Sequence, residues 1–370
     1  MSALNQKSLL SFFISSVAVV GVLLATPQDA AAQGCLLTRN MAPVLGAQLS
    51  PYLQPGEWQV GANYRQFTAD HQYQGTELNP AVTRLGTQVI SKMQYMDVNA
   101  TYAVSTQLSV VAGAPIIVNA SSNRALPATV AGSPRFAHTT RGLGDMTVGG
   151  RYWFMDCDSN PAQNFAFGVG VKMPTGNSTA TDMFPNGLGQ DVRERPVDQS
   201  IQLGDSGWGF NVTAEGFKQF GYVSAFASGV YLFNPKDQND TLSPPALLNP
   251  VGPTAVAEVQ RFNTVSDSYL ARAGVGVAVP KLTGLSATLA ARIEGVPVKD
   301  LIGETAGFRR PGNFVTVEPG LIFGYGRTMV FVNVPIRVSQ NVKPSLGFAR
   351  DSTFADHMVL AGTTIRFGGF

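Results

Sequence analysis

The residues best suited to chemistry are single charged side chains within stretches of alternating apolar and polar residues. Only 14% of the 370 residues are charged, against about 25% in a typical globular domain. Charged side chains that face one another across a narrow passage tune which solutes cross it. The candidates for such a luminal constriction are Arg65, Asp97, Asp145, Arg151, Lys172, Glu215, Arg272, Arg292, Glu294, Glu318, Arg327 and Arg337.

These charges have two interpretations. In an open lumen they form a selective constriction, whereas in a closed lumen they pair and fill a narrow barrel with its own side chains. The seven basic candidates outnumber the five acidic ones, so an open lumen is expected to favour anions mildly. Reversal potentials that favour cations would contradict that preference.

Catalytic chemistry is not expected from this sequence. The three histidines, His71, His138 and His357, fall in predicted loops, and nothing places a serine beside one of them, as a hydrolase requires. A metal site built from His71 and His357 would find no further ligands beyond Asp70 and Asp356. We therefore expect no enzyme, no metal and no cofactor.

Alternation with a period of two identifies the elements that carry the charged residues. Leu285, Ala287 and Leu289 share one face of a segment, and Ser286 and Thr288 share the other. About twelve such segments, each roughly ten residues long, fill the chain. Their polar faces carry Ser, Thr, Asn and Gly rather than the charged residues of a sheet that faces bulk water. The predicted fold class is all-β: a transmembrane antiparallel up-and-down β-barrel of about twelve strands.

Three segments depart from the pattern. The register of 221–233 is ambiguous, and 106–119 is apolar on both faces, which indicates that something packs against it inside the barrel. In the last segment, 358–370, Phe367 lies on the outer face but Phe370 has the opposite parity. A bulge at Gly368-Gly369 would restore the register.

The connections predict the topology. Short ones near 105, at 156–162, 218–221, 279–284 and 326 alternate with long ones at 70–91, 119–142, 174–205, 234–264, 297–312 and 339–357. Such alternation is typical of barrels with short periplasmic turns and long extracellular loops. The first strand, 57–69, is expected to pair with 358–370, so both ends of the barrel lie in the periplasm.

Residues 1–32 have the features of a secretory signal peptide. Lys7 precedes an apolar run over 9–25, and Ala30-Ala31-Ala32 offers small residues for cleavage. An uncleaved membrane helix is the alternative. Residues 33–56 would then form a periplasmic segment, either a plug that enters the lumen or a disordered leader, and residues 57–370 form the barrel.

The two cysteines, Cys35 and Cys157, fall on the same oxidising side of the membrane in this topology. We predict a disulfide between them, with two unpaired thiols as the alternative. A lipid anchor on Cys35 is less suitable, because Ala32-Gln33-Gly34 is a poor lipobox. Two reactive thiols in the non-reduced protein would contradict the disulfide.

Two short motifs resemble the signatures of a known family. Gly142-Leu143-Gly144-Asp145 enters one strand, and Val171-Lys172-Met173-Pro174-Thr175-Gly176 leaves the next. With the similar opening YLQPGEWQV at 52–60, they resemble the outer-membrane "meta-pathway of phenol degradation" family, whose members are compared with long-chain fatty-acid channels. The resemblance implies a barrel that passes small hydrophobic or aromatic compounds.

Asp145 has its own interpretation. Gly142 and Gly144 allow a tight turn before the strand, after which Asp145 faces the lumen. We interpret it as half of a local Asp145–Arg151 pair at a structural corner, with a contact to a solute as the alternative.

The sequence and the resemblance together predict a channel for passive uptake of small hydrophobic or aromatic compounds. Its expected partners are outer-membrane lipid, the barrel-assembly machinery and a small hydrophobic solute. A net charge of +2 without a basic run gives no reason to expect nucleic acid. The alternative is a structural or surface-interaction barrel with a salt-bridged, closed lumen, whose long loops, such as 234–264, bind a partner.

Overall fold

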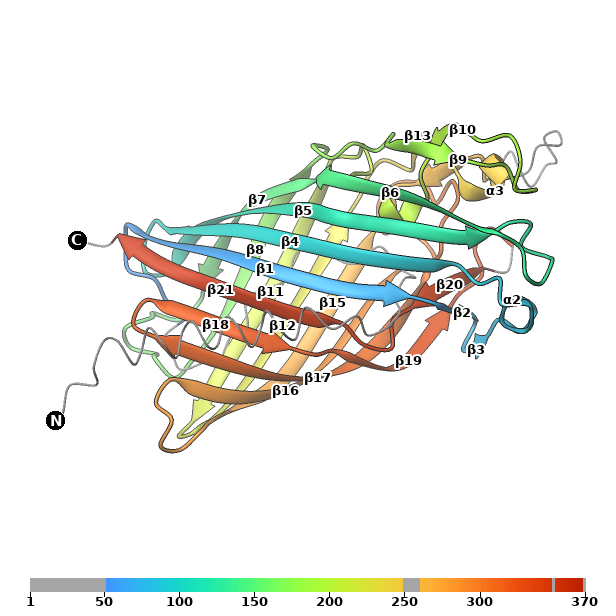
Figure 1. Ribbon diagram of the computed structural model, residues 1–370. Coiled ribbons are helices and arrows are strands. Elements are labelled where there is room, and N and C mark those ends of the chain that lie inside the picture. Colours follow the sequence, from blue (N-terminus) through green and yellow to red (C-terminus); the bar gives the residue numbers. More distant parts are fainter. Residues whose placement is uncertain (1–50, 249–259, 348–349, 369–370) are drawn as a thin grey trace.

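Alternating strands dominate the computed structural model, which describes residues 51–248, 260–347 and 350–368. Twelve antiparallel strands close into a barrel (Figure 1), as the sequence predicts. Two barrel strands are interrupted, so that β6 continues into β7 and β18 into β19. The barrel segments are β1 (Glu57–Ala69), β4 (Ile90–Ala103), β5 (Leu108–Ala125), β6 (Arg135–Leu143), β7 (Met146–Trp153), β8 (Gln163–Met173), β11 (Gly209–Phe220), β12 (Val223–Phe233), β15 (Ser268–Ala278), β16 (Leu285–Val296), β17 (Gly312–Tyr325), β18 (Thr328–Asn333), β19 (Ile336–Val342) and β21 (Val359–Gly368).

The first and last strands form the seam of the barrel. Glu57 lies opposite Gly368, and Gln66 lies opposite Val359. The predicted pairing of these two segments is therefore present over the described part of the last one. Phe370, whose register was in question, lies outside the described residues.

The short turns lie at one end of the barrel, called the turn end, and the long connections lie at the other, called the loop end (Figure 1). The long connections carry the small elements β2 (His71–Gln74), β3 (Glu77–Leu78), α2 (Pro80–Leu85), β9 (Thr181–Phe184), β10 (Arg193–Pro196), η1 (Gln199–Ile201), β13 (Gln238–Leu242), α3 (Pro244–Leu248), β14 (Phe262–Thr264) and β20 (Asp351–Phe354). In the described ranges, no helix has the length and hydropathy needed to span a membrane.

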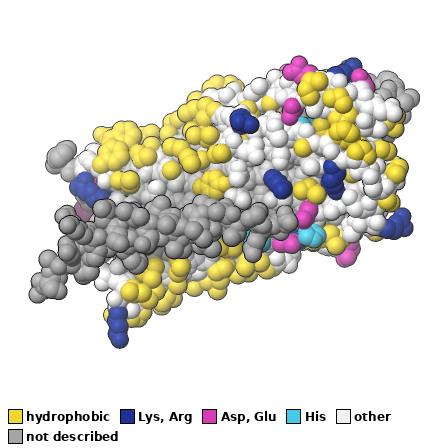
Figure 2. Space-filling view, in the orientation of Figure 1, with side chains coloured by type: hydrophobic (Ala, Val, Ile, Leu, Met, Phe, Trp, Pro, Cys, Tyr) yellow, Lys and Arg dark blue, Asp and Glu magenta, His cyan; other side chains and the backbone are white. Residues whose placement is uncertain are grey.

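The outer wall of the barrel is apolar. Along β8, Phe165, Phe167 and Val169 are exposed, whereas Ala166 and Gly168 between them are buried. On the face shown in Figure 2, hydrophobic side chains cover much of the wall, and most acidic side chains lie towards the loop end. A sheet in water shows the opposite pattern, because there the apolar face is buried.

A shallow groove of about 610 Å³ hollows this wall between β8 and β17. It exists because two rows of small residues cross the strands side by side. One row is Ala214, Gly229 and Ala271, and the other is Gly216, Ala227, Ala273 and Ala291. Phe165 and Phe167 border the groove on one side, and Ile293 and Val315 border it on the other.

The interior is layered along the barrel axis. A hydrophobic cluster fills the loop end and includes Ile117 on β5 together with Ile201 and Leu203 from the connection 174–208. This connection packs against Ile117 at one end of the segment 106–119, which is apolar on both faces, whereas Val111 of the same segment lines a luminal cavity. An aromatic cluster lies near the turn end, where Phe226 faces inward and so settles the register of 221–233.

Candidate functional site: a polar cavity in the lumen

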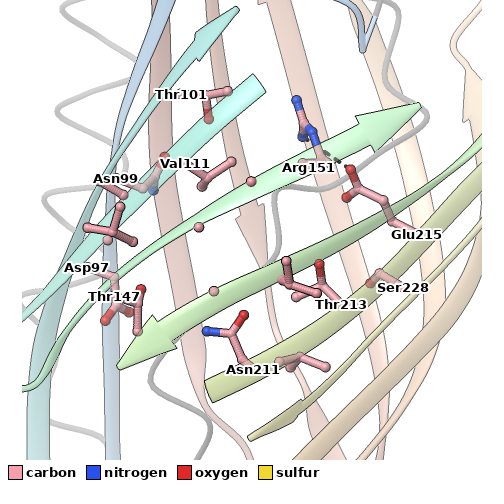
Figure 3. A pocket seen from close by; sticks show the side chains of 18 of the residues that line it. Asp97, Asn99, Thr101, Val111, Thr147, Arg151, Asn211, Thr213, Glu215 and Ser228 are labelled. Atoms are coloured by element: carbon pink, nitrogen blue, oxygen red, sulfur yellow. Dashed lines mark hydrogen bonds and ion pairs between the residues drawn. The ribbon is translucent and has the colours of Figure 1, made fainter. Parts of the chain in front are cut away.

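A cavity of about 160 Å³ lies inside the barrel, against the wall formed by β4, β5, β7, β8, β11 and β12 (Figure 3). Most of its inward-facing polar side chains are uncharged hydroxyls and amides, and Val111, Pro115 and Val230 supply apolar surface. The polar lining residues are Asp97, Asn99, Thr101, Thr147, Arg151, Asn211, Thr213, Glu215 and Ser228.

Glycines make room for the cavity. Gly149 and Gly170 face each other on β7 and β8, and a Cβ on Gly149 would lie 2.7 Å from the Cα of Gly170. A Cβ on Gly170 would lie 3.0 Å from Oδ1 of Asn211. The strands therefore approach closely here without filling the lumen with side chains.

An ion pair borders the cavity on the side of β7 and β11. Nη1 of Arg151 donates a hydrogen bond of 3.1 Å to Oε1 of Glu215 (Figure 3). The two residues stand on β7 and β11 with β8 between them, and Gly168 is the β8 residue opposite Arg151. Arg151 also lies over the ring of Trp153, 5.4 Å from its centroid. The pair thus presents no net charge to the cavity.

Three further pairs complete what we call the charged layer. Arg65 lies 3.4 Å from Asp97 and stacks on Tyr95. On the opposite wall, one pair joins Arg272 to Glu318 at 2.7 Å and another joins Arg292 to Glu294 at 2.9 Å. The charged layer comprises Arg65, Asp97, Arg151, Glu215, Arg272, Arg292, Glu294 and Glu318.

The two family-like motifs contact each other. The hydroxyl of Thr175 donates to the carbonyl of Gly144 at 2.8 Å and accepts from the backbone N–H of Met146 at 2.9 Å. Oδ1 of Asp145 accepts from the backbone N–H of Gly176 at 2.9 Å. Pro174 lies between the end of β8 and this contact. The motifs therefore fix the point at which the connection 174–208 leaves the barrel wall.

The predicted Asp145–Arg151 pair is wrong. Asp145 instead lies 4.0 Å from Lys172 and accepts from the backbone N–H of Asp205 at 3.1 Å, while Arg151 pairs with Glu215. Six residues along an extended strand span about 20 Å, so two inward side chains at this spacing stand in different layers. Ion pairs in this lumen form mainly between strands.

Two predicted luminal residues lie elsewhere. Arg327 is exposed in the two-residue turn between β17 and β18, which begins at Gly326 with a φ of 58°. Arg337 follows the break at 334–335 between β18 and β19 and contacts Asp356 at 2.5 Å and the ring of Tyr73 at the loop end. Parity along a strand does not reveal where the strand stops, and this is why both were misplaced.

Without these two arginines, the basic surplus of the predicted lumen disappears. Five basic residues remain, Arg65, Arg151, Lys172, Arg272 and Arg292, against the five predicted acidic ones. Lys172 also forms an ion pair with Asp205. The premise of an anion preference is therefore not met.

The turn end of the lumen has an aromatic floor. The rings of Tyr52, Trp153 and Phe217 meet edge to face, with centroids 5.4 to 5.9 Å apart. Cys157 packs in the same cluster, and burial raises the pKa of its thiol to about 11. Its predicted disulfide partner, Cys35, lies outside the described residues, as do the signal peptide and most of the possible plug, so these stay predictions.

The loop end is closed by the connection 174–208. Burial alone would raise the pKa of Asp198, but Arg310 and Arg124 outweigh it and hold that pKa well below its ordinary value. Nε2 of His138 accepts from the backbone N–H of Asp198 at 3.4 Å. Burial lowers the pKa of His138 to about 4. Its strand, β6, projects beyond the apolar wall, since Arg141 is exposed on the outer face.

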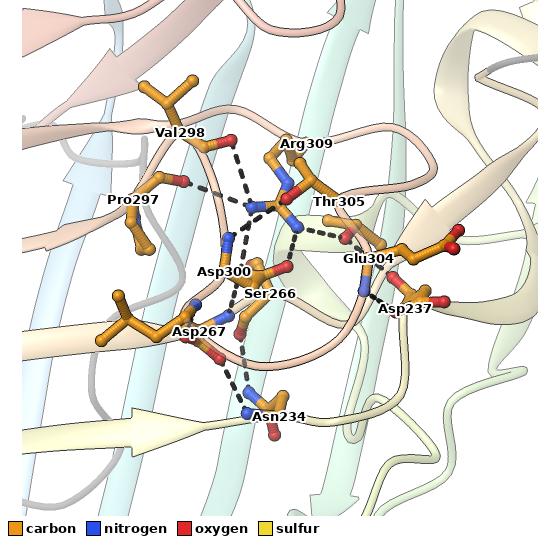
Figure 4. A network of polar contacts seen from close by, with 12 residues as sticks. Asn234, Asp237, Ser266, Asp267, Pro297, Val298, Asp300, Glu304, Thr305 and Arg309 are labelled. Carbon is orange, nitrogen blue, oxygen red and sulfur yellow. Dashed lines mark hydrogen bonds and ion pairs between the residues drawn. The ribbon is translucent and has the colours of Figure 1, made fainter.

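A polar network holds the neighbouring connections 234–267 and 297–311 together (Figure 4). Arg309 pairs with Asp300 and donates to Oγ1 of Thr264 at 2.9 Å. Asp267 accepts from the backbone N–H of Asn234 at 2.7 Å and donates its own N–H to Asp300 at 2.9 Å. These contacts join the described parts of the two connections into a rim beside the segment 174–208.

The histidines are not gathered into a catalytic or metal site in the part of the chain that the structure describes. Nδ1 of His71 lies 2.8 Å from Asp70 and 3.7 Å from Asp356, whereas His138 stacks on Phe184. His357 forms an isolated bridge with Ile336. No cluster of three or more metal-binding side chains occurs among the described residues.

The constriction candidates taken from the sequence are all charged, and so they leave out the neutral lining of the cavity. Asn99, Thr147, Asn211, Thr213 and Ser228 stand at inward positions of their strands, so alternation alone could have found them. Their inward parity is visible in the sequence, but nothing in the sequence marks them as the lining of a cavity. Asp198 had no comparable signal, since it lies in a connection without periodicity.

Comparison with known proteins finds similar solved structures only, and each of them at low identity. No protein-family model matches the chain, and neither does any curated protein sequence. Among solved structures, the β-domain of the Bordetella autotransporter BrkA shares 11% identity with a TM-score of 0.42, over 84% of this chain and 100% of that chain. The Ralstonia pickettii toluene transporter TbuX shares 11% with a TM-score of 0.39, over 85% and 90%. The monoaromatic hydrocarbon channel TodX shares 8% with a TM-score of 0.39, over 88% and 93%.

Values this low carry no argument about activity. The closed barrel and its apolar outer wall define the class by themselves: this is a transmembrane β-barrel of the outer-membrane type. The narrower resemblance to the meta-pathway family stays a prediction.

Proposed function

We propose that the chain is an outer-membrane channel for passive uptake of small, uncharged and largely apolar solutes, including single-ring aromatic compounds. The observation that carries this proposal is the luminal cavity of about 160 Å³. A cavity of about 150 Å³ holds a benzene molecule, so the space suits a solute of that size. The neutral hydroxyls and amides of the lining can hydrogen-bond a single polar substituent.

The ion pairs beside the cavity also favour an uncharged solute. The basic groups beside the cavity are paired with carboxylates, so an anion would meet no free counter-charge there. In this proposal the export signal is cleaved, the loop end faces outward, and the turn end faces the periplasm. Lipid surrounds the apolar wall, and the barrel-assembly machinery inserts the barrel into the outer membrane.

The test is uptake in a strain that lacks the gene, with wild-type and variant copies returned on a plasmid. Radiolabelled phenol and toluene at low external concentration serve as probes. Ser228→Phe places a ring in the cavity and should reduce uptake strongly. Its matched control is Ala227→Phe, on the adjacent outward position, which should leave uptake unchanged. Equal uptake with and without the wild-type gene would refute the channel.

One observation favours a second function. Clusters of buried side chains occupy the lumen at both ends, as expected for a structural barrel whose loops bind a partner. This alternative requires that neither Ser228→Phe nor loss of the whole gene changes solute influx, and that shortening a loop such as 234–264 abolishes partner binding.

A further inference from the structure

The connection 174–208 folds into the barrel instead of standing outside it. Val197 is fully buried, Ile201 is 1% exposed and Leu203 is 8% exposed. These side chains share one hydrophobic cluster with Phe314 on β17 and Leu360 on β21. The connection therefore fills the lumen between opposite walls.

This segment is separate from the wall in its own hydrogen bonding. β9 and β10 pair with each other in a two-stranded sheet that is not part of the barrel sheet. The backbone N–H of Val197 donates to Ala180 within the same segment at 3.0 Å. Contacts with the wall include the hydroxyl of Thr140, which donates to the carbonyl of Ile201 at 2.5 Å. Side-chain contacts of this kind can break without disrupting the barrel ladder.

Two carboxylates hold the segment in place. At its base, Asp145 accepts from the backbone N–H groups of Gly176 and Asp205, at the two places where the segment meets the wall. At its inner part, Asp198 pairs with Arg124 on β5 and lies 3.5 Å from Arg310 in the connection after β16. Both carboxylates are almost fully buried.

The held segment lies next to the cavity. Lys172, which pairs with Asp205, stands opposite Thr147 in the cavity lining. Asn211, also in the lining, follows Gly209, the first residue after the segment, by two positions. Movement of the segment would therefore connect the cavity with the loop end.

We propose that residues 174–208 form a gate over the cavity, with Asp145 and Asp198 as the positioning residues that hold it closed. The gate rests on the proposed function as a channel. In the closed state the hydrophobic cluster bars the loop end, and the gate opens by releasing Asp198 from Arg124 and Arg310 while Asp145 keeps the base attached.

The experiment measures opening and conduction separately. Val197→Cys, in a chain with Cys35→Ser and Cys157→Ser, reports opening through its rate of reaction with a water-soluble maleimide. Planar-bilayer recordings report the open fraction. Asp198→Asn should raise both the labelling rate and the open fraction about tenfold, as expected for the loss of one charge-assisted hydrogen bond. Asp240→Asn, which removes an exposed carboxylate from the neighbouring connection, is the control and should change neither.

Asp145→Asn distinguishes the contact at the base of the segment from the inner contact made by Asp198. It should raise the labelling rate less than Asp198→Asn does, because the inner contacts remain. Folded barrels are verified in every variant by their mobility on unheated gels. Unchanged labelling in both variants would overturn the gate while leaving conduction by the wild type as support for the channel. Faster labelling, with uptake of radiolabelled phenol no higher than in the strain that lacks the gene, would overturn the proposed function and, with it, the role of the segment as a gate.

Discussion

Replacing Glu318 tests whether the charged layer excludes water. Its side chain is fully buried and lies 2.7 Å from Arg272. At that separation two unit charges attract by roughly 6 kcal/mol for an effective dielectric constant of about 20, and by roughly 1.5 kcal/mol in water. Glu318→Gln keeps the shape of the side chain but removes its charge, so Arg272 loses this counter-ion.

The expected cost distinguishes a closed lumen from a hydrated pore. Removing one partner of a buried pair costs about 3–5 kcal/mol, whereas an exposed pair contributes about 1 kcal/mol or less. Urea unfolding in lipid vesicles, followed by tryptophan fluorescence, gives the free energy of unfolding. The double variant Arg272→Met/Glu318→Leu should recover most of the loss, because it leaves neither charge unpaired.

The two outcomes that refute this reasoning are both measurable. A loss below about 1 kcal/mol for Glu318→Gln would mean that water screens the pair and that the lumen is open at this level. A double variant as unstable as the single one would mean that packing, rather than charge, sets the cost. Asp240→Asn again serves as the control for loss of an exposed carboxylate.

Three further predictions concern charge, pH and the thiol. Reversal potentials in planar bilayers should show no anion preference, and a clear one would contradict the balanced lumen. The pKa of His138 is about 4 in the closed state, against an ordinary value of 6.5, so His138 binds its proton more tightly when the segment 174–208 moves away from it. The closed gate therefore loses up to about 3 kcal/mol as the pH falls from about 6.5 towards 4. Maleimide labelling of Val197→Cys should rise over that range, and a pH-independent rate would count against the assignment; the charged groups that face His138 are Asp198, Arg124 and Asp182. Finally, Cys157 should react slowly with thiol reagents at pH 8 in the folded protein, because burial raises the pKa of its thiol. The predicted disulfide between Cys35 and Cys157 would be established if mass spectrometry detects it after unfolding without reductant.

Most of the barrel could be predicted because alternation is a local signal. Each strand separates its own residues into two faces, so the outward positions of Leu285 and Leu289 followed directly from the sequence. The seam between the first and last strands followed from counting short and long connections. Neither inference requires knowledge of side-chain contacts between strands.

The partners of the charged residues could not be predicted in the same way. Arg151 pairs with Glu215 across an intervening strand, and that pairing depends on register and on a glycine opposite the arginine. The inward path of 174–208 was also beyond reach, because Val197 and Ile201 lie in a segment with no period to analyse. The position of this segment depends on contacts with residues of distant strands inside the lumen, and not on its neighbours in the sequence.

The close approach of Gly176 and Gly204 has a mechanical consequence. A Cβ on Gly176 would lie 2.8 Å from the Cα of Gly204, so the two ends of the connection touch where they meet the barrel. A segment tethered at both ends in one place swings as a single flap, and its return is a unimolecular step. Because the segment stays tethered beside its binding surface in the lumen, its effective concentration there is high. Reclosure therefore does not depend on the number of copies in the membrane, and each barrel opens and closes independently.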